Sequence, residues 1–287
     1  MQKRGEEMNR VCDLHTHSVF SDGTCTPTEI IVAAAELGLS AVALSDHNTV
    51  DGLPEFLSAA KDAEVEAVAG AEFSVDYNGK ELHLLGLYLP ETAFADISAL
   101  MKEVNARKEA SNLALVDSLG RAGYSLDYSV MVGRTPAGKI NRAHIAAELT
   151  AKGYTASIKE AFDTLLSKTG GHYVEPKRLT VWEMIRFIRD IGAVPVLAHP
   201  FLNLDEAELT AFLPSAKEQG LLGMECCYSL YSEEETEKSR TIADAFGLAP
   251  SGGSDFHGTN KPDIRLGSGK GNLAVPHAWA VALRELR

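Results

Sequence analysis

Two histidines separated by one residue, and an aspartate shortly after them, stand near the start of the chain in the sequence DLHTHSVFSDG. These residues are His15, His17 and Asp22. Alternate residues of a β-strand point to the same face, so His15 and His17 can both reach one metal ion. Imidazole nitrogens and carboxylate oxygens are common ligands of divalent metals. The stretch therefore predicts a metal site at the end of a short strand.

Further metal-capable side chains occur near the ends of later predicted strands. They are His47 in ALSDHN, Glu72 in GAEFS, His83 in ELHLLG, His199 in VLAHP, and Asp255 and His257 in GGSDFHG. Active sites of α/β proteins form at the carboxyl ends of the strands, so we expect these side chains to meet. The set exceeds what one four-coordinate ion needs, and its mixed nitrogen and oxygen donors favour Zn²⁺, Mn²⁺ or Fe²⁺ over Ca²⁺. We therefore expect two or three ions, which at about 3.5–4 Å spacing can share a water and lower its pKa.

The remaining histidines and two adjacent cysteines could also bind metal, but most of them are interpreted as structural residues. A single histidine at a strand end is more often structural than metal-binding, and the prediction depends on the whole series. His172 and His277 are interpreted as structural residues of a loop and of a C-terminal helix, while His144 leaves both interpretations open. The adjacent Cys226 and Cys227 are interpreted as core residues of a strand rather than as soft ligands.

Short β-rich runs alternate with amphipathic helical patterns, which predicts a mostly parallel α/β sheet or barrel. Strands are predicted at 11–16, 41–45, 66–75, 81–89, 194–198, 223–227 and 248–252. Helices are predicted at 27–37, 53–63, 181–191, 205–219 and 233–246. The first helix has Thr26 as N-cap, Pro27 at its first position and Gly38 after its end. Asn78-Gly79 between two strands predicts a hairpin, where the strict β-α-β alternation is broken.

The alternation of strands and helices stops between residues 90 and 178. Helical patterns at 95–120, 144–152 and 158–167 follow one another there without a strong strand. This predicts a helical insertion carried between two strands of the α/β body. The expected domains are the first part of the barrel at 1–92, the helical insertion or cap at 93–178, and the second part of the barrel at 179–287.

Composition narrows the class of protein. The 287 residues are 45% hydrophobic, enough to bury a sizeable core, and no apolar run approaches the length of a membrane-spanning helix. The first ten residues lack an apolar segment, and the four cysteines form no CxxC pair, so we expect free thiols and a cytoplasmic protein. The net charge of −13 disfavours long DNA as a partner but is compatible with a small phosphorylated nucleotide at a metal cluster.

The ordered motifs DLHTHSVFSDGTCTPTEI, ALSDHNTVDGL, GAEFS, LHLLG, VLAHP and GGSDFHGTNKP resemble those of the PHP (polymerase and histidinol phosphatase) family of metal-dependent phosphoesterases. Within that family, NRAHIAAELTAKGY and AFDTLL resemble the bacterial subgroup that hydrolyses nucleoside 3′,5′-bisphosphates. Some members of this subgroup also shorten RNA from its 5′ end. The resemblance implies a distorted seven-stranded barrel of PHP type, a helical insertion domain and a three-metal centre.

The resemblance also implies residue roles. One ion would be held by His15, His17, Glu72 and Asp255; a second by Asp22, His47 and His257; a third by Glu72, His83 and His199. The residues assigned to catalysis are Asp22, His47, Arg142 and His257. Arg142 falls where the subgroup has an arginine beside the substrate phosphate, and His144 and Lys177 are further substrate-binding candidates. Guanidinium donors suit a phosphate in their own right.

Two positions depart from the family pattern. Asn48 stands where an aspartate is common, and Ala143 stands where a proline is common. Neither position is a predicted ligand, so both bear on substrate preference rather than on the metal centre.

The expected activity is hydrolysis of a phosphate monoester, namely the 3′-phosphate of a nucleoside 3′,5′-bisphosphate, with AMP and phosphate as products from the adenosine substrate. Manganese is the first choice of metal, with iron, zinc or magnesium as alternatives. The alternative activities are a 5′-3′ exoribonuclease on short 5′-phosphorylated RNA and a histidinol-phosphate phosphatase. A metal-dependent amidohydrolase also begins with H-x-H, but SDG and DFH favour a phosphoesterase. The non-enzymatic alternative is a PHP module that binds metal and nucleotide without turnover.

Overall fold

The computed structural model describes residues 10–135, 140–174, 176 and 178–287. The chain divides into two compact units, one of Met1–Ser98 with Leu179–Arg287 and the other of Ala99–Arg178. The first unit contains every strand of the described residues.

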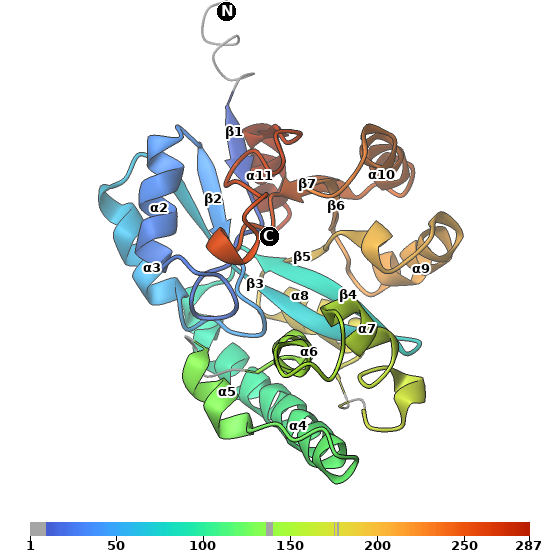
Figure 1. Ribbon diagram of the computed structural model, residues 1–287. Helices are drawn as coiled ribbons and strands as arrows, with labels where there is room; N and C mark the ends of the chain where they lie inside the picture. Colours follow the sequence, from blue (N-terminus) through green and yellow to red (C-terminus); the bar gives the residue numbers. More distant parts are fainter. Residues whose placement is uncertain (1–9, 136–139, 175, 177) are drawn as a thin grey trace, which may run out of the picture. The chain divides into compact units, whose positions relative to one another are not determined.

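Eight strands of the first unit form one sheet in the order β7-β6-β5-β4-β3-β2-β1-β8 (Figure 1). Their bounds are β1 Val11–Asp13, β2 Ala41–Leu44, β3 Glu66–Tyr77, β4 Lys80–Leu87, β5 Val194–Leu197, β6 Gly223–Tyr228, β7 Ala249–Gly253 and β8 Val275–Pro276. Strands β1, β2 and β3 run parallel, and so do β5, β6 and β7. Strand β4 is antiparallel to both β3 and β5, and β8 is antiparallel to β1.

Backbone hydrogen bonds between the two ends of this sheet nearly close it into a barrel. The amide of Leu14 donates to the Gly252 carbonyl at 3.1 Å, and that of Asp255 donates to the His15 carbonyl at 2.8 Å. The predicted class of a distorted α/β barrel is thus confirmed, although the sheet has eight strands instead of the expected seven. The additional strand β8 was not predicted, because two residues are too few to show an alternating pattern.

The predicted hairpin is confirmed between β3 and β4. Asn78 and Gly79 at its tip have φ values of 52° and 78°, as a two-residue turn between twisted antiparallel strands requires. Glycine carries no penalty there, and asparagine tolerates the left-handed region better than most residues. This turn reverses the chain, so β4 enters the barrel antiparallel to its neighbours.

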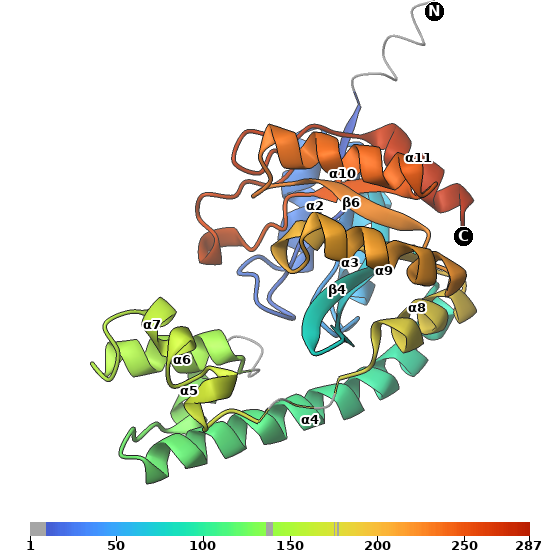
Figure 2. The same cartoon turned by 90° about the vertical axis from the view of Figure 1, so that its right-hand side faces the viewer.

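Helices cover the barrel: α2 Pro27–Glu36, α3 Leu53–Ala59, α8 Val181–Asp190, α9 Glu206–Glu218, α10 Glu233–Ala245 and α11 His277–Glu285. Helix α10 packs along β6 (Figure 2). Helix α11 packs along β7. Helix α2 begins as predicted, because Thr26 and Glu29 form a reciprocal capping box and Pro27 occupies the first turn. The predicted helix at 53–63 is instead an α-helix followed by a 3-10 turn at Ala60–Asp62.

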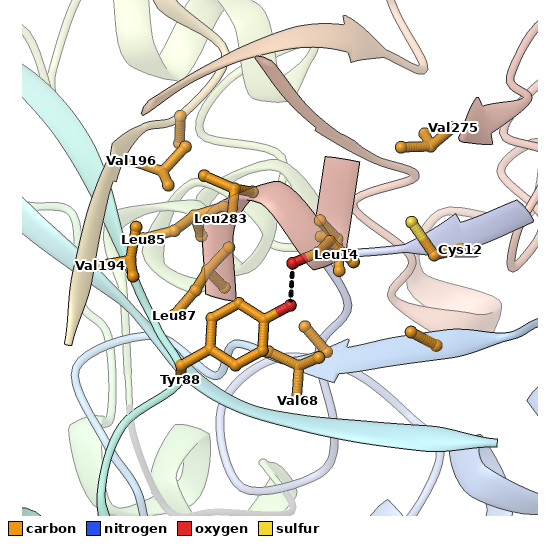
Figure 3. Close-up of a cluster of buried hydrophobic side chains, with 14 residues drawn as sticks. Cys12, Leu14, Val68, Leu85, Leu87, Tyr88, Val194, Val196, Val275 and Leu283 are labelled. Atoms are coloured by element: carbon orange, nitrogen blue, oxygen red, sulfur yellow. Dashed lines mark hydrogen bonds between the residues drawn. The ribbon is translucent and has the colours of Figure 1, made fainter. Parts of the chain in front are cut away.

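The barrel interior is filled by apolar side chains that come from most of its strands. Leu14, Val68, Leu85 and Val196 are at most 1% exposed (Figure 3). The ring of Tyr88 packs among them, and its hydroxyl donates to the Ala280 carbonyl at 2.6 Å. Full burial of each such aliphatic side chain contributes about 1.5–3 kcal/mol to the stability of the fold. The packed interior therefore holds the strands, and the residues at their ends, in fixed positions.

The second unit is helical and has its own apolar core. Its helices are α4 Phe94–Arg121, which begins in the first unit, α5 Tyr128–Arg134, α6 Arg142–Ala151 and α7 Ile158–Asp163. Leu115, Leu119, Ile145 and Leu149 are fully buried in this core. Helix α5 was not predicted, and α7 is shorter than the expected 158–167. Among the described residues, no helix combines the length and apolar character needed to cross a bilayer.

Candidate metal centre

The predicted ligands gather at one rim of the barrel. His15 and His17 follow β1, His47 follows β2, and His199 follows β5. Asp255 and His257 follow β7, and Glu72 lies within β3. These strands are mutually parallel within each half of the sheet, so their carboxyl ends bring side chains distant in sequence to one place.

His83 reaches the same rim from the opposite direction. It lies near the start of β4 and pairs with Ser74 near the end of β3. The expectation that His83 stands at the C-terminal end of its strand is therefore wrong. Because β4 is antiparallel, its first residues face the rim that the other strands reach with their last residues.

The backbone adopts uncommon conformations at this rim. His199 and Asp255 have φ values of 27° and 57°, and Asn48, next to His47, has 50°. Non-glycine residues rarely take positive φ, and those that do are often found at functional sites. The side-chain oxygen of Asn48 accepts a hydrogen bond from the Ser74 amide at 3.1 Å, which ties this turn to β3.

All nine predicted ligands belong to one cluster. Four overlapping groups have potential ligand atoms within 4.8 Å of one another: His17, Asp22, His47 with His257; His15, Glu72 with His199; His15, His17 with Asp255; and His47, Glu72 with His83. Each group offers nitrogen and oxygen donors together. This donor chemistry suits divalent transition metals.

Glu72 is the central residue of the cluster. Its Oε1 lies 2.7 Å from His83 Nδ1 and 3.0 Å from His199 Nε2. Its Oε2 lies 3.0 Å from His47 Nδ1 and 3.2 Å from His15 Nε2. The same Oε2 lies 3.3 Å from His17 Nε2. The carboxylate therefore contacts five of the histidines and has the position of a bridging ligand.

The pKa values of these side chains are set by their burial and by the many titratable neighbours within the cluster. Burial opposes ionisation of Glu72, but the neighbouring imidazoles, His47 first, outweigh it and hold the pKa of the carboxyl well below its usual range. Burial, with His257 and His47 nearby, lowers the pKa of His17 to about 3, so its imidazole is neutral near pH 7. Burial also disfavours the charged form of His83, yet Glu72 outweighs it and raises that pKa to about 10. Metal ions would thus compete with protons for some of these nitrogens.

Unsatisfied buried atoms provide an independent test of whether these residues suit a metal. Eight buried side-chain nitrogen or oxygen atoms of the described residues lack a hydrogen bond, and six belong to predicted ligands. The six are His15 Nε2, both ring nitrogens of His17, Asp22 Oδ1, Glu72 Oε2 and His199 Nδ1. Buried polar atoms without partners are costly in ordinary cores. Their concentration around one point fits a site that binds cations.

Other carboxylates support the segments that carry the ligands. Asp46 Oδ1 accepts hydrogen bonds from the Ser18 amide at 2.7 Å and the Ser21 hydroxyl at 2.6 Å, which orders the loop that leads to Asp22. Asp13 does the same at β7, since it accepts bonds from the amide and hydroxyl of Ser254 at 2.8 and 2.5 Å.

The sequence did not single out Asp13, Glu225, Tyr228 or Lys261 as residues of the site. Lys261 Nζ lies 2.6 Å from Asp255 Oδ2, and Tyr228 and Glu225 also contact ligands. The signal for Lys261 was its place in HGTNKP, four residues after the last histidine of the motif. Buried acidic residues within the apolar strand patterns were the available signal for Asp13 and Glu225.

The candidate substrate-binding residues belong to the helical unit. Arg142 is the first residue of α6, and its guanidinium carbon lies 4.4 Å from the ring centroid of Tyr173. His144 completes a capping box with Asn141, which gives it a structural role at the start of the helix. Lys177 lies outside the described residues. Contact of Arg142 or His144 with a substrate stays a prediction.

Residues interpreted as structural have ordinary partners. His172 Nδ1 lies 3.0 Å from the Ser118 hydroxyl, and His277 Nε2 lies 3.5 Å from Glu66 Oε2. All four cysteines are free thiols, as predicted. Cys226 is fully buried, and burial raises the pKa of its thiol to about 12.

The fold and this cluster define a metal-dependent phosphoesterase, and comparison with known proteins agrees. Residues 13–178 match the PHP domain model, and the chain belongs to the PHP family. A metal-dependent phosphoesterase from Bifidobacterium adolescentis has a similar structure, with a TM-score of 0.78, 26% identity and 96% of both chains covered.

Curated relatives share the family but differ in activity. The chain is 30% identical to a 5′-3′ exoribonuclease of Haemophilus influenzae, over 87% of this chain and 91% of that protein. It is 31% identical to a phosphoribosyl 1,2-cyclic phosphate 1,2-diphosphodiesterase of Eggerthella lenta, over 86% and 94%. It is 29% identical to a 3′,5′-nucleoside bisphosphate phosphatase of Chromobacterium violaceum, over 85% and 86%. The relatives therefore agree on phosphate ester chemistry and differ in substrate.

Proposed function

We propose that this protein removes the 3′-phosphate of nucleoside 3′,5′-bisphosphates and releases the nucleoside 5′-monophosphate. The observation that carries the proposal is the cluster of nine residues with nitrogen or oxygen donors, with Glu72 at its centre. The helical insertion with Arg142 and the similarity to the Chromobacterium violaceum enzyme support the choice of substrate. The relevant metals are two or three divalent ions, with Mn²⁺ tested first.

The cluster has a deep side and an open side. The side chains of His15 and His17 are fully buried, whereas those of Asp22 and His47 are 29% and 25% exposed. A substrate phosphate would therefore arrive beside the group formed by His17, Asp22, His47 and His257. In this proposal these residues would hold divalent ions, which would supply positive charge beside the phosphoryl oxygens.

The reaction is balanced by one water. Its oxygen bonds to phosphorus as the bond from phosphorus to the ribose 3′-oxygen breaks, and its proton ends on that ribose oxygen. Bound divalent ions lower the pKa of water and neutralise phosphoryl charge. The chain keeps the imidazole of His17 neutral, and Asp22 ionised, because His47 and His257 outweigh the burial that would raise the pKa of this carboxyl.

Residues 93–178 would act as a cap that selects the rest of the nucleotide. In this proposal Arg142 binds the second phosphate, with His144 and Lys177 as further contacts. The guanidinium of Arg142 is stacked on Tyr173, and a stacked guanidinium is pre-organised for planar, two-point contact with a phosphate. The proposed place of action is the cytoplasm, on a free nucleotide.

The test measures phosphate release and product identity with protein reconstituted with Mn²⁺. The substrates are adenosine 3′,5′-bisphosphate, a short 5′-phosphorylated RNA, phosphoribosyl 1,2-cyclic phosphate and histidinol phosphate. We expect AMP and phosphate from the bisphosphate at the highest kcat/KM. Asp255→Asn serves as the inactive control, and Glu208→Gln on the surface helix α9 serves as the matched acidic control.

A second candidate is 5′-3′ exoribonuclease activity, which the Haemophilus influenzae relative favours. Progressive shortening of the RNA, with a kcat/KM equal to or above that for the bisphosphate, would replace the proposed substrate. Preferential opening of the cyclic phosphate would replace it as well. Bound metal without hydrolysis of any of the four compounds would favour a metal-binding module without turnover.

A further inference from the structure

Strand β6 supplies none of the nine predicted ligands, yet two of its side chains contact three of them. Glu225 Oε1 lies 3.0 Å from His15 Nδ1, and Glu225 Oε2 accepts a bond from the His199 amide at 2.8 Å. The hydroxyl of Tyr228 donates to Asp255 Oδ2 at 2.8 Å. Glu225 is fully buried, and Tyr228 is 2% exposed.

A β-bulge explains how both side chains reach the same site. Residues 225 and 228 differ by an odd number, so in a regular strand they would point to opposite faces. The pairing with β7 shifts between Glu225 and Cys227, because Glu225 pairs with Ser251 and Cys227 pairs with Gly252. The extra residue, Cys226, restores the alternation after the bulge. Bulges often re-aim side chains next to active sites in this way.

We propose that Glu225 and Tyr228 are positioning residues that orient the ligands of the metal centre. This inference rests on the proposed metal site. A carboxylate can only accept, so Glu225 keeps a proton on His15 Nδ1. The Nε2 atom of His15 then faces Glu72 Oε2 at 3.2 Å and is free to bind an ion. A hydrogen bond to the far ring nitrogen of a ligating histidine is a common way to fix its tautomer and ring orientation.

Tyr228 acts on Asp255 in a comparable way. Asp255 Oδ2 is occupied by the Tyr228 hydroxyl at 2.8 Å and by Lys261 Nζ at 2.6 Å. The other oxygen, Oδ1, lies 3.1 Å from His17 Nε2. The two partners of Oδ2 thus leave Oδ1 as the oxygen that Asp255 presents to an ion.

Glu225 is a supporting residue and not a tenth ligand. Both of its oxygens are engaged, one by the His15 ring and the other by the His199 amide. None of the four groups of potential ligands in the described chain includes it. By joining the segments that follow β1 and β5, it sets the spacing between two ligands that are 184 residues apart in sequence (199 − 15).

The experiment compares metal binding of the full chain and of the variants Glu225→Gln, Glu225→Ala and Tyr228→Phe. The matched control is Cys227→Ser, because Cys227 lies on the same strand and belongs to none of the four ligand groups of the described residues. Equilibrium dialysis with Mn²⁺ and elemental analysis give affinity and stoichiometry. We expect about 10-fold weaker binding for Glu225→Gln and Tyr228→Phe, and up to about 100-fold for Glu225→Ala, at unchanged maximal stoichiometry.

A spectroscopic measurement separates positioning from general destabilisation. In protein loaded with diamagnetic Zn²⁺, NMR should show a slowly exchanging Nδ1 proton on His15. This signal should be lost in Glu225→Ala and kept in Tyr228→Phe and in the control. Circular dichroism establishes that each variant is folded.

Two results would overturn the inference. Wild-type affinity in both Glu225→Ala and Tyr228→Phe would exclude positioning, and loss of one whole ion in both Glu225 variants would make Glu225 a ligand. Failure of the proposed function looks different. In that case the variants would bind metal less tightly as expected, while the wild-type protein would hydrolyse none of the tested phosphate esters.

Discussion

The deep side and the open side of the candidate metal centre are built differently. On the deep side, His15 and His17 are fully buried and their segment is hydrogen-bonded to the end of β7. On the open side, Asp22 stands on a loop after β1, and its side chain is 29% exposed. The deep side depends on strand pairing across the whole chain, whereas the open side depends on a short loop held by Asp46.

This difference separates two tasks within one cluster. Buried, multiply bonded ligands fix ions in place, because few alternative geometries remain for them. Partly exposed ligands can admit water and exchange partners as a substrate binds. We therefore expect substitutions on the deep side to remove metal and activity together, and substitutions on the open side to affect activity more than total metal content.

The largest effect is expected on the deep side. His17→Ala and Asp255→Asn should each lower kcat/KM by more than about 100-fold and reduce bound metal, since loss of a mere supporting partner already costs ~10–100-fold. Elemental analysis and phosphate release measure the two quantities on the same samples. His277→Ala is the matched histidine control, because His277 lies outside the cluster beside Glu66.

Full metal content and full activity in either deep-side variant would contradict the model of the site. Loss of activity with metal retained would instead move His17 or Asp255 from metal binding to another role.

A smaller effect on metal is expected on the open side. Asp22→Asn removes one charged oxygen from the group that contains His47 and His257, while the groups around Glu72 remain complete. We expect loss of at most one ion and a decrease in kcat of about 100-fold, as for removal of one electrostatic contact to a reacting group. Metal stoichiometry and kcat at saturating Mn²⁺ measure this. Loss of all metal from Asp22→Asn would remove the distinction between the two sides.

The deep side was the more predictable part of the molecule. The period-2 spacing of His15 and His17 and the histidines after strand-like runs indicated a cluster at one rim, and the structure brings all nine residues together. The hairpin at Asn78-Gly79 followed from local turn chemistry. In these cases the decisive information is local in sequence, or repeats from one strand to the next.

The missed features depend on long-range pairing. The bulge in β6 exists only against β7, so no local pattern indicated that Glu225 and Tyr228 face the same site. The two residues of β8 form a strand because β1 is available as a partner. The direction of β4 was implied by the hairpin, yet its consequence for His83 required the full order of the sheet.

Substitution of Arg142 in the helical unit should have an effect of intermediate size. Arg142→Ala should raise KM for the bisphosphate by about 10-fold, because one charge-assisted contact worth about 1.5–3 kcal/mol would be lost in part to water. The metal content of the protein and its affinity for Mn²⁺ should not change. Arg142→Lys keeps the charge but not the planar contact, so it should restore only part of the affinity. Arg134→Gln, whose guanidinium pairs with Glu148, is the matched control.

An unchanged KM in Arg142→Ala would remove this arginine from the substrate-binding site. A loss of metal in that variant would show that the division between metal binding in the barrel and substrate selection in the insertion is too simple.

The smallest effect concerns the packing around β6, the strand in which Cys226 lies fully buried next to Glu225. Burial raises the pKa of its thiol from 9.0 to about 12. Cys227 and Glu225 raise this pKa further, whereas Arg240 lowers it. The folded state therefore holds this proton more tightly than the unfolded chain. The stabilisation is complete below pH 9 and is lost as the pH rises towards 12, because the unfolded thiol ionises first.

Between pH 8 and pH 10 the wild-type protein should lose about 1 kcal/mol more of its free energy of unfolding than Cys226→Ala does. Urea unfolding of both proteins at the two pH values measures this difference, in which the titration of all other groups cancels. Equal losses in the two proteins would mean that water reaches the thiol, and that β6 is less tightly covered than the burial of Cys226 indicates.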